Sequence, residues 1–139
     1  MNESDSLNYT MIPPSVDEYT RLRESVGFAA RSPEAAGKGL AGGLFTVTVR
    51  DGEAAVGMAR VVGDGGCSFL VVDVIVLPEY QRRGIGRRMM EMLDSWMVSN
   101  IPPGGMVSLL GDAPGRRLYE EFGFNYTYPE SVGMKRRIG

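Results

Sequence analysis

The pattern of apolar positions in the middle of the chain predicts three consecutive strands. Residues 44–50 alternate between apolar and polar side chains, and the Asp51-Gly52 pair that follows is typical of a hairpin turn. A partner strand runs from about Ala54 to Gly63. After the turn at Asp64-Gly65-Gly66, residues 68–76 are β-branched and almost entirely apolar. Such a run indicates a central strand that is covered on both faces.

Helical patterns lie on either side of these strands. Ser15 and Glu18 have the spacing of a capping box, and apolar residues then recur at helical spacing as far as Gly27. Ser32-Pro33-Glu34 is a second helix start, but the glycines that follow predict a weak or short helix. A third helix begins after Gly84, with Ile85, Met89, Met92, Leu93 and Trp96 on one face.

Shorter elements complete the order. Residues 7–12, 106–110, 124–128 and 132–137 are expected to form strands, and residues 114–122 a helix. The resulting order, β-α-α-β-β-β-α-β-α-β-β, predicts an α/β (α+β) fold in which helices pack on a mixed, mostly antiparallel sheet. With 139 residues and no evident linker, we expect one domain over residues 1–139.

Composition narrows the class of protein. The formal net charge is −2, which argues against a general nucleic-acid binder, and the arginine clusters are local. We expect neither a signal peptide nor a membrane span. Cys67 is the one cysteine, so a reducing, cytoplasmic location is expected. The chain has no histidine, which removes the commonest metal ligand and the usual general base; we expect no metal.

The segment Gln81-Arg-Arg-Gly-Ile-Gly86 lies between the apolar strand and the third helix. The first N–H groups of a helix lack carbonyl partners, and the helix dipole adds positive charge there. Glycines at 84 and 86 allow a bulky anion to approach these amides, and the arginines strengthen the field. The spacing is not that of a nucleoside-triphosphate loop, and Met89 occupies the third glycine position of a dinucleotide fingerprint. A different phosphate ligand is therefore indicated.

Two motifs resemble those of the GCN5-related N-acetyltransferases. Residues 81–86 match the family's Q/R-x-x-G-x-G/A motif and follow its usual lead-in, Val74-Ile-Val-Leu-Pro78. Residues 117–124 resemble its second signature, L-Y-x-x-x-G-F, and the element order agrees over nearly the whole chain. The resemblance implies a sheet of six to seven strands flanked by about four helices. It also implies a splay between the two central parallel strands and acetyl-CoA as cosubstrate, with its pyrophosphate in the 81–86 turn.

The resemblance assigns roles to individual residues. Val74 and Val76 would bond the pantetheine amides through their backbone, and a backbone N–H of Ile75 or Val76 would stabilise the acyl oxyanion. Tyr119 would protonate the departing thiolate, as a phenol can. The cofactor-binding residues implied are Val74, Ile75, Val76, Gln81, Arg82, Arg83, Gly84, Ile85, Gly86, Arg87, Arg88, Asp112, Gly115 and Tyr119.

The sequence departs from the family pattern at several positions. Asp112 and Gly115 stand where the family often has Asn and Ala, and Leu70 occupies the place of a glutamate that serves some members as general base. Asp73 is the one ionisable group in that strand. It is a candidate general base or orienting group, and a structural ion pair is the simpler interpretation. Glu24, Glu34 and Glu130 are candidates for binding a substrate ammonium.

These observations favour an N-acetyltransferase that moves an acetyl group to a primary amine by direct attack, because Cys67 lacks a histidine partner for a covalent mechanism. A CoA-binding regulatory module without catalysis is the main alternative, and a nucleic-acid-binding domain is a third. The acceptor stays open among polyamines, amino acids, aminoglycosides and protein amines. We expect no nucleic-acid or membrane partner, and a homodimer is compatible with the resemblance.

Overall fold

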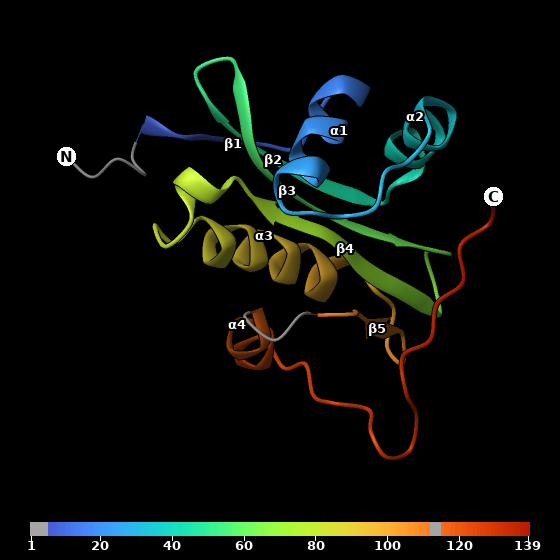
Figure 1. The fold of residues 1–139 in the computed structure, drawn as a ribbon. Helices are drawn as coiled ribbons and strands as arrows, with labels where there is room; N and C mark the ends of the chain where they lie inside the picture. Colours follow the sequence, from blue (N-terminus) through green and yellow to red (C-terminus); the bar gives the residue numbers. More distant parts are fainter. Residues whose placement is uncertain (1–5, 112–114) are drawn as a thin grey trace.

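The computed structural model describes residues 6–111 and 115–139. In these residues the strands are β1 (Asn8–Thr10), β2 (Phe45–Asp51), β3 (Ala54–Gly63), β4 (Ser68–Val76) and β5 (Met106–Ser108). They form one sheet in the order β1-β2-β3-β4-β5 (Figure 1). Strands β1 to β4 pair with one another antiparallel, and β5 pairs parallel to β4. The mixed, mostly antiparallel sheet predicted from the sequence is confirmed.

The helices are α1 (Val16–Ser25), α2 (Pro33–Gly42), α3 (Ile85–Asn100) and α4 (Arg116–Glu121), and a 3₁₀ turn, η2 (Pro78–Tyr80), precedes α3. The capping box at Ser15 and Glu18 is present, with both reciprocal hydrogen bonds. Ser32 caps α2 as predicted. The glycines do not shorten α2, which runs for ten residues because Ala36 and Leu40 are buried against its neighbours.

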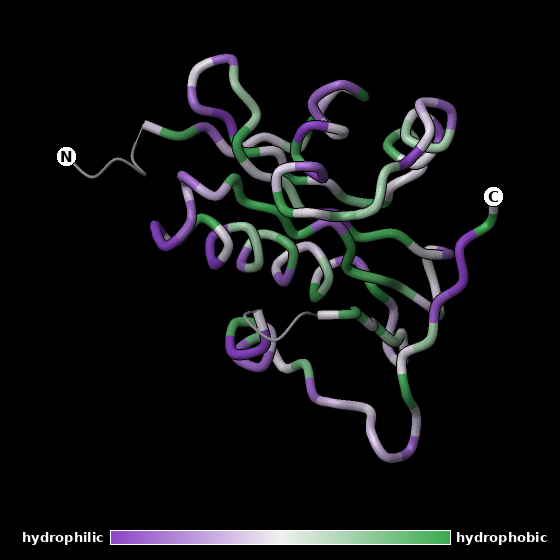
Figure 2. Tube along the Cα trace, viewed as in Figure 1, coloured by the Kyte–Doolittle hydropathy of each residue, from purple (hydrophilic) through white to green (hydrophobic). Residues whose placement is uncertain are grey.

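The two faces of the sheet carry separate cores. Tyr19, Leu22, Ala36 and Leu40 of α1 and α2 pack on Met58 and Ile75 of the sheet. On the opposite face α3 buries Ile85, Met89, Met90, Leu93 and Met97, so its buried stripe is rotated slightly from the predicted one, and Met92 and Trp96 are half-buried. Figure 2 shows the apolar residues along the strands and the inner side of α3, with hydrophilic residues in the turn before α3.

A β-bulge interrupts β4 at Asp73. Arg60 of β3 pairs with Val72 and Met58 pairs with Ile75, so Ala59 lies opposite two residues, Asp73 and Val74. Asp73 has a left-handed backbone conformation (φ 53°). The extra residue reverses the side-chain alternation, as a bulge does. As a result Phe69 and Val71 face α3, whereas Ile75 faces α1 and α2.

The parallel strands β4 and β5 pair over only three positions. The register ends at Leu70 opposite Ser108, but β4 continues for six more residues to Val76. Among the described residues no strand pairs with this second half of β4 on its β5 side. The expected splay between the two parallel strands is therefore present, and it leaves an open strand edge that ends at the turn before α3.

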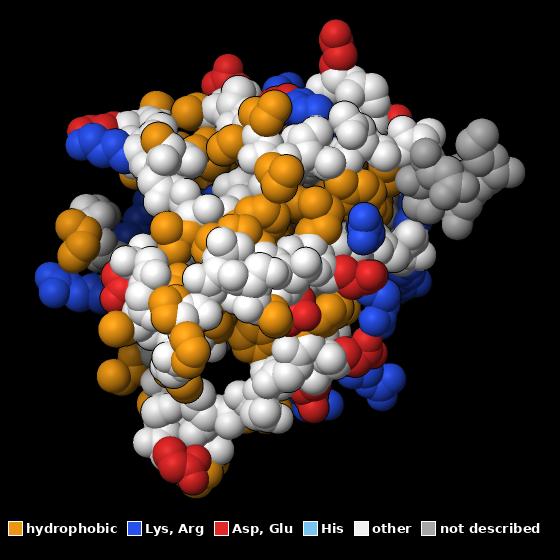
Figure 3. Space-filling view, turned by 180° about the vertical axis from the view of Figure 1, so that it is seen from behind, with side chains coloured by type: hydrophobic (Ala, Val, Ile, Leu, Met, Phe, Trp, Pro, Cys, Tyr) orange, Lys and Arg blue, Asp and Glu red, His pale blue; other side chains and the backbone are white. Residues whose placement is uncertain are grey.

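The C-terminal segment differs from the sequence-based expectation of a sheet with six to seven strands. Neither residues 124–128 nor residues 132–137 form a strand, and the sheet within the described residues has five. A β-branched or aromatic run forms a strand only when it pairs with another edge. Residues 132–139 are exposed, and although Gly133 lies beside Leu110, the described backbone hydrogen bonds include no ladder between them. Figure 3 shows the hydrophobic side chains exposed on the far face of the molecule.

Candidate active site

The open half of β4 directs backbone groups toward the splay. The amide of Leu77 donates to the carbonyl of Val56 on β3, so by strand alternation the backbone groups of Val76 point to the opposite edge. There the side-chain amide of Gln81 donates to the Val76 carbonyl at 2.9 Å. Because a carbonyl oxygen has two lone pairs, this bond leaves Val76 able to accept a second donor. Val74 and Val76 pack their side chains toward α3, and Ile75 is buried on the other face.

The turn between η2 and α3 has the backbone of an anion-binding site. Arg82 and Gly84 both have left-handed conformations (φ 65° and 82°), which orient successive amides toward one side of the chain. Gly84 is the N-cap of α3, and the helical hydrogen bonds begin only with the Arg88 amide, which donates to the Gly84 carbonyl. The amides of Ile85, Gly86 and Arg87 therefore have no helical partner. Together with the dipole of a 16-residue helix, they form a positive, hydrogen-bond-donating surface.

The two glycines of the turn contribute in different ways. Gly84 requires glycine for its backbone conformation, and a Cβ at this position would meet nothing within 4 Å. A Cβ on Gly86 would contact Leu118 of α4 at 3.6 Å, an ordinary van der Waals distance. Gly86 thus keeps the space between the α3 N-terminus and α4 open, and a methyl group would still fit there.

The arginines of the turn and of the first turn of α3 are exposed, and Arg83, Arg87 and Arg88 are each oriented by a neighbour. The guanidinium of Arg83 lies 5.1 Å from the centre of the Tyr80 ring, and that of Arg88 lies 6.0 Å from the Tyr9 ring on β1. Arg87 forms an ion pair with Glu121 of α4, which lowers the pKa of the Glu121 carboxyl. Arg87 therefore faces α4, whereas Arg88 faces β1.

Tyr119 lies half-buried on α4, beside the chain that continues from β5. A Cβ built on Gly111 would come within 2.8 Å of the Tyr119 ring, so glycine at position 111 allows the ring to approach the backbone. The ring also packs against the core on the α3 side. Gly115 is the N-cap residue of α4. Asp112, the other residue expected here, lies outside the described residues.

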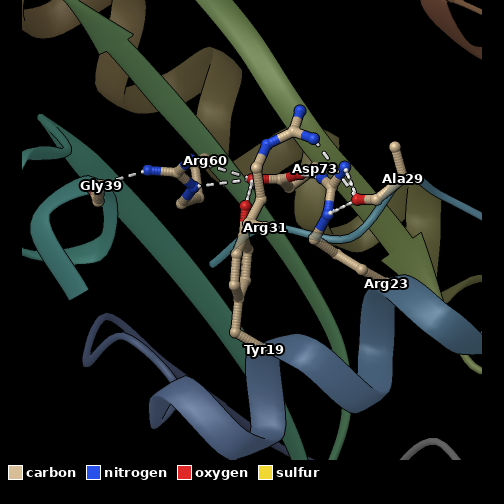
Figure 4. Close-up of polar contacts among 7 residues, drawn as sticks. All are labelled: Tyr19, Arg23, Ala29, Arg31, Gly39, Arg60 and Asp73. Atoms are coloured by element: carbon tan, nitrogen blue, oxygen red, sulfur yellow. Dashed lines mark hydrogen bonds and ion pairs between the residues drawn. The ribbon is translucent and has the colours of Figure 1, made fainter. Parts of the chain in front are cut away.

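Asp73 at the bulge accepts hydrogen bonds from three side chains (Figure 4). Its Oδ1 accepts from Arg23 Nη1, and its Oδ2 accepts from Tyr19 at 2.8 Å and from Arg60 Nε at 3.0 Å. The carboxylate is only 5% exposed. Burial and the charge of Asp73 raise the pKa of Tyr19. These contacts support a structural ion pair or an orienting group as the role of Asp73. They do not fit a general base, because the carboxylate is not free to accept a proton from an amine.

The three candidate ammonium ligands come from separate segments. Glu24 is exposed on α1, Glu34 is exposed on α2 and paired with Lys38, and Glu130 is exposed in the segment after α4. None of the described contacts joins them. Cys67 is exposed at the start of β4, where its amide donates to the Asp64 carboxylate, far along the strand from the turn before α3.

Sequence reasoning did not identify Gly111 or the partners of Asp73. Two signals pointed to these partners: a lone carboxylate in an apolar strand needs buried donors, and Tyr19 and Arg23 lie four residues apart on one helix face. For Gly111 no signal was available, because its role depends on the position of a ring from another element.

Other surface features lie apart from this site. A hollow of about 350 Å³ lies between the C-terminal half of α3 and residues 122–124. It begins at Asp94, about 12 Å along the helix from Gly86. Within residues 6–111 and 115–139, no group of three or more His, Cys, Asp or Glu side chains could hold a metal ion. None of the helices in these residues is long and apolar enough to cross a membrane.

Comparison with known proteins identifies the family. Residues 41–126 match the family model of the acetyltransferase (GNAT) domain. A GCN5-related N-acetyltransferase 2, chloroplastic, from Arabidopsis thaliana is 33% identical over 77 residues, 55% of this chain. That match spans only 29% of the plant protein.

Solved structures extend the likeness to nearly the whole fold. A protein of unknown function from methicillin-resistant Staphylococcus aureus, described as a probable acetyltransferase, is 39% identical with a TM-score of 0.91. The similarity covers 95% of this chain and 99% of that one. A GNAT-family acetyltransferase from Streptococcus pneumoniae is 27% identical with a TM-score of 0.71, over 96% of each chain. With the family model matching more than half of its length, this chain belongs to the GNAT family of acetyltransferases.

Proposed function

We propose that the protein transfers an acetyl group from acetyl-CoA to a primary amine by direct attack of the amine on the thioester. The observation that carries this proposal is the junction of the open β4 edge with the turn before α3. The open edge offers backbone partners to an extended arm, and the turn offers amides and arginines to a pyrophosphate. When bound, acetyl-CoA supplies the activated acetyl group.

In this proposal the backbone of the turn holds the pyrophosphate through the amides of residues 82–87. Arg82, Arg83, Arg87 and Arg88 add positive charge, and Arg87 or Arg88 reaches the ribose phosphate. Val74 and Val76 bond the pantetheine amides, with Gln81 fixing the Val76 carbonyl from the side. The backbone N–H of Val76 stabilises the oxyanion that develops on the acyl group, because by strand alternation the backbone groups of Ile75 point toward β3.

Tyr119 is the proposed acid that protonates the departing thiolate. A position for the phenol on the β5 side of the splay is supported by the contact of its half-buried ring with Gly111, which follows β5 in the chain. A positioned phenol can deliver a proton to a thiolate as the carbon–sulfur bond breaks. The general base has no candidate of equal quality, since the Asp73 carboxylate is engaged by three side chains. Water or the acceptor's own equilibrium with its neutral form can supply the free amine.

Direct attack is favoured over an acetyl-enzyme on Cys67. Cys67 precedes Val76 by nine residues, about 30 Å of extended strand, at the opposite end of β4 from the turn. A thiol at that distance could not receive an acetyl group from CoA whose pyrophosphate binds before α3. Both substrates are therefore expected to be bound together when transfer takes place.

A CoA-binding module without catalysis is the second candidate, because it would use the same turn. Thiol release from acetyl-CoA in the presence of a broad panel of amines distinguishes the two. An amine-dependent release above the background hydrolysis supports the transferase. Tight acetyl-CoA binding by calorimetry with no amine-dependent release would leave only the binding module.

A further inference from the structure

The loop between α1 and α2 brings the guanidinium groups of Arg23 and Arg31 to one carbonyl oxygen. Arg23 Nε and Nη2 donate to the Ala29 carbonyl at 3.1 and 2.8 Å, and Arg31 Nη1 approaches the same oxygen at 3.4 Å (Figure 4). Arg23 also pairs with Asp73, as does Arg60. Arg31 thus lies beside Arg23 at a shared carbonyl, and these three cations outnumber the one carboxylate of Asp73, which leaves an excess of positive charge on this side of the sheet.

Every guanidinium nitrogen of Arg23 and of Arg60 already has a partner, whereas Arg31 is available. Arg23 and Arg60 are buried, and their donors go to Asp73, Ala29 and Gly39. Arg31 is exposed, and in the described part of the chain its one hydrogen bond is the long one to Ala29. Two donors from Arg23 already fill the lone pairs of that oxygen. Most donors of the Arg31 guanidinium therefore remain for a ligand.

Nearby carboxylates do not neutralise this charge. Glu34 is paired with Lys38, and their side chains are 78% and 79% exposed. Glu24 adjoins Arg23 in α1, but successive residues of a helix point in different directions, and Glu24 is exposed whereas Arg23 is buried. An anionic ligand would satisfy the exposed guanidinium, with Arg23 and Arg60 adding to the attraction from below.

The cluster of Arg23, Arg31, Arg60 and Asp73 lies near the expected position of the thioester. Asp73 precedes Val76, the last residue of β4, by three residues, about 10 Å of strand. An arm that runs from the turn back along the open edge of β4 reaches the bulge at this distance. The Asp73 side chain points toward α1 and α2, so an amine that approaches the thioester from this side passes the loop that carries Arg31.

We infer that Arg31 forms a subsite for a small oxyanion, a carboxylate or a phosphate, carried by the acceptor amine. The acceptor is accordingly an acidic amine, such as an amino acid or a phosphorylated amino sugar, rather than a polyamine. The location of this subsite beside the acceptor rests on the proposed function. The excess of positive charge around Arg31 is independent of the proposed function.

Matched pairs of acceptors test the inference by activity. Each pair differs only in the anion: an amino acid and its carboxamide, and an amino sugar and its phosphate. Arg31→Ala should raise KM for the anionic member about 10-fold or more, with kcat within a few-fold, because a charge-assisted bond to a remote group is lost. KM for the neutral member should not change. Arg21→Ala, which removes an exposed arginine of α1 outside the cluster, is the charge-matched control.

A binding measurement separates this inference from the proposed function. With CoA saturating the turn before α3, inorganic phosphate and acetate are each compared with chloride at matched ionic strength in a thermal melt. One of the two should raise the Tm of the wild type and of Arg21→Ala, but not of Arg31→Ala, and its identity distinguishes phosphate from carboxylate. This result supports the subsite even if no amine is acetylated, in which case the proposed function fails alone. Equal Tm shifts in all three proteins, or an unchanged KM for acidic acceptors in Arg31→Ala, would overturn the subsite.

Discussion

Replacing Asp73 by Asn tests whether the buried ion cluster holds α1 and β3 to the bulge of β4. The substitution removes the charge but hardly changes side-chain size. Asn tolerates a left-handed backbone as well as Asp does, so the conformation at φ 53° costs nothing extra. The effect should therefore come from the guanidinium groups of Arg23 and Arg60, which lose their counter-charge.

The expected loss of stability follows from the burial of the cluster. The side chains of Asp73, Arg23 and Arg60 are 5%, 8% and 9% exposed, so water cannot replace the missing carboxylate. Removing one partner of a buried pair typically costs about 3–5 kcal/mol, a large part of the roughly 5–15 kcal/mol that stabilises a domain. For a chain of this length that corresponds to a fall in Tm of about 10–20 °C.

Chemical denaturation with urea, followed by circular dichroism, measures the free energy of unfolding. Glu34→Gln is the control, because it breaks an exposed helical pair whose contribution should be below about 0.5 kcal/mol. Adding Arg60→Met to Asp73→Asn should recover part of the loss, since it removes one of the two uncompensated charges. A loss below about 1 kcal/mol, or no recovery in the double variant, would refute the role given to the cluster.

Four further outcomes are expected. Tyr119→Phe should lower turnover about 10²–10⁴-fold and leave acetyl-CoA affinity within a few-fold in calorimetry; near wild-type turnover would return Tyr119 to a packing role. Gly86→Glu should abolish acetyl-CoA binding, whereas Gly86→Ala, whose Cβ has room, should retain it; binding by a folded Glu variant would remove the pyrophosphate from this turn. Cys67→Ala should keep most of the activity, and an acetylated Cys67 in mass spectra that passes its group to an amine would contradict direct transfer. The pKa of Glu18 is lowered to about 2, chiefly by its hydrogen bond with Arg50, so its stabilisation is complete above the unfolded pKa near 4.5 and is lost as pH falls toward 2. Between these pH values the free energy of unfolding should therefore fall on the order of 1–2 kcal/mol less in Glu18→Gln than in the wild type. An equal fall in both proteins would contradict the role given to the Glu18–Arg50 pair.

The elements set by local signals could be predicted from the sequence. The capping box at Ser15, the hairpin at Gly52, the strand at 68–76 and the start of α3 after Gly84 all depend on neighbouring residues, and all are confirmed. The turn before α3 was predictable for the same reason, because two glycines and a helix start are adjacent in the chain.

Features that depend on distant partners were not predictable. The pattern of residues 132–137 predicts a strand, yet whether these residues form one depends on a partner edge that the pattern does not reveal. The environment of Asp73 depends on donors 13, 50 and 54 residues away in the chain. Sequence reasoning could name Asp73 as a candidate base, but it could not show that three side chains already occupy the carboxylate.

The bulge at Asp73 also has a consequence for how β4 tolerates substitution. In a saturation library, polar residues should be rejected at positions 69 and 71, and then at 75 as well, because each is buried. The buried environments of these positions differ, because residues 69 and 71 pack on the α3 side of the sheet and residue 75 packs on the side of α1 and α2. Compensating substitutions should follow that division, with defects at 71 rescued from α3 and defects at 75 rescued from α1 or α2. Deleting Asp73 itself should leave these faces unchanged, because Val74 would lie opposite Ala59 and Ile75 would stay opposite Met58. Deleting Val71 or Val72 instead would shift the residues on one side of the deletion by one position relative to β3 and exchange their faces.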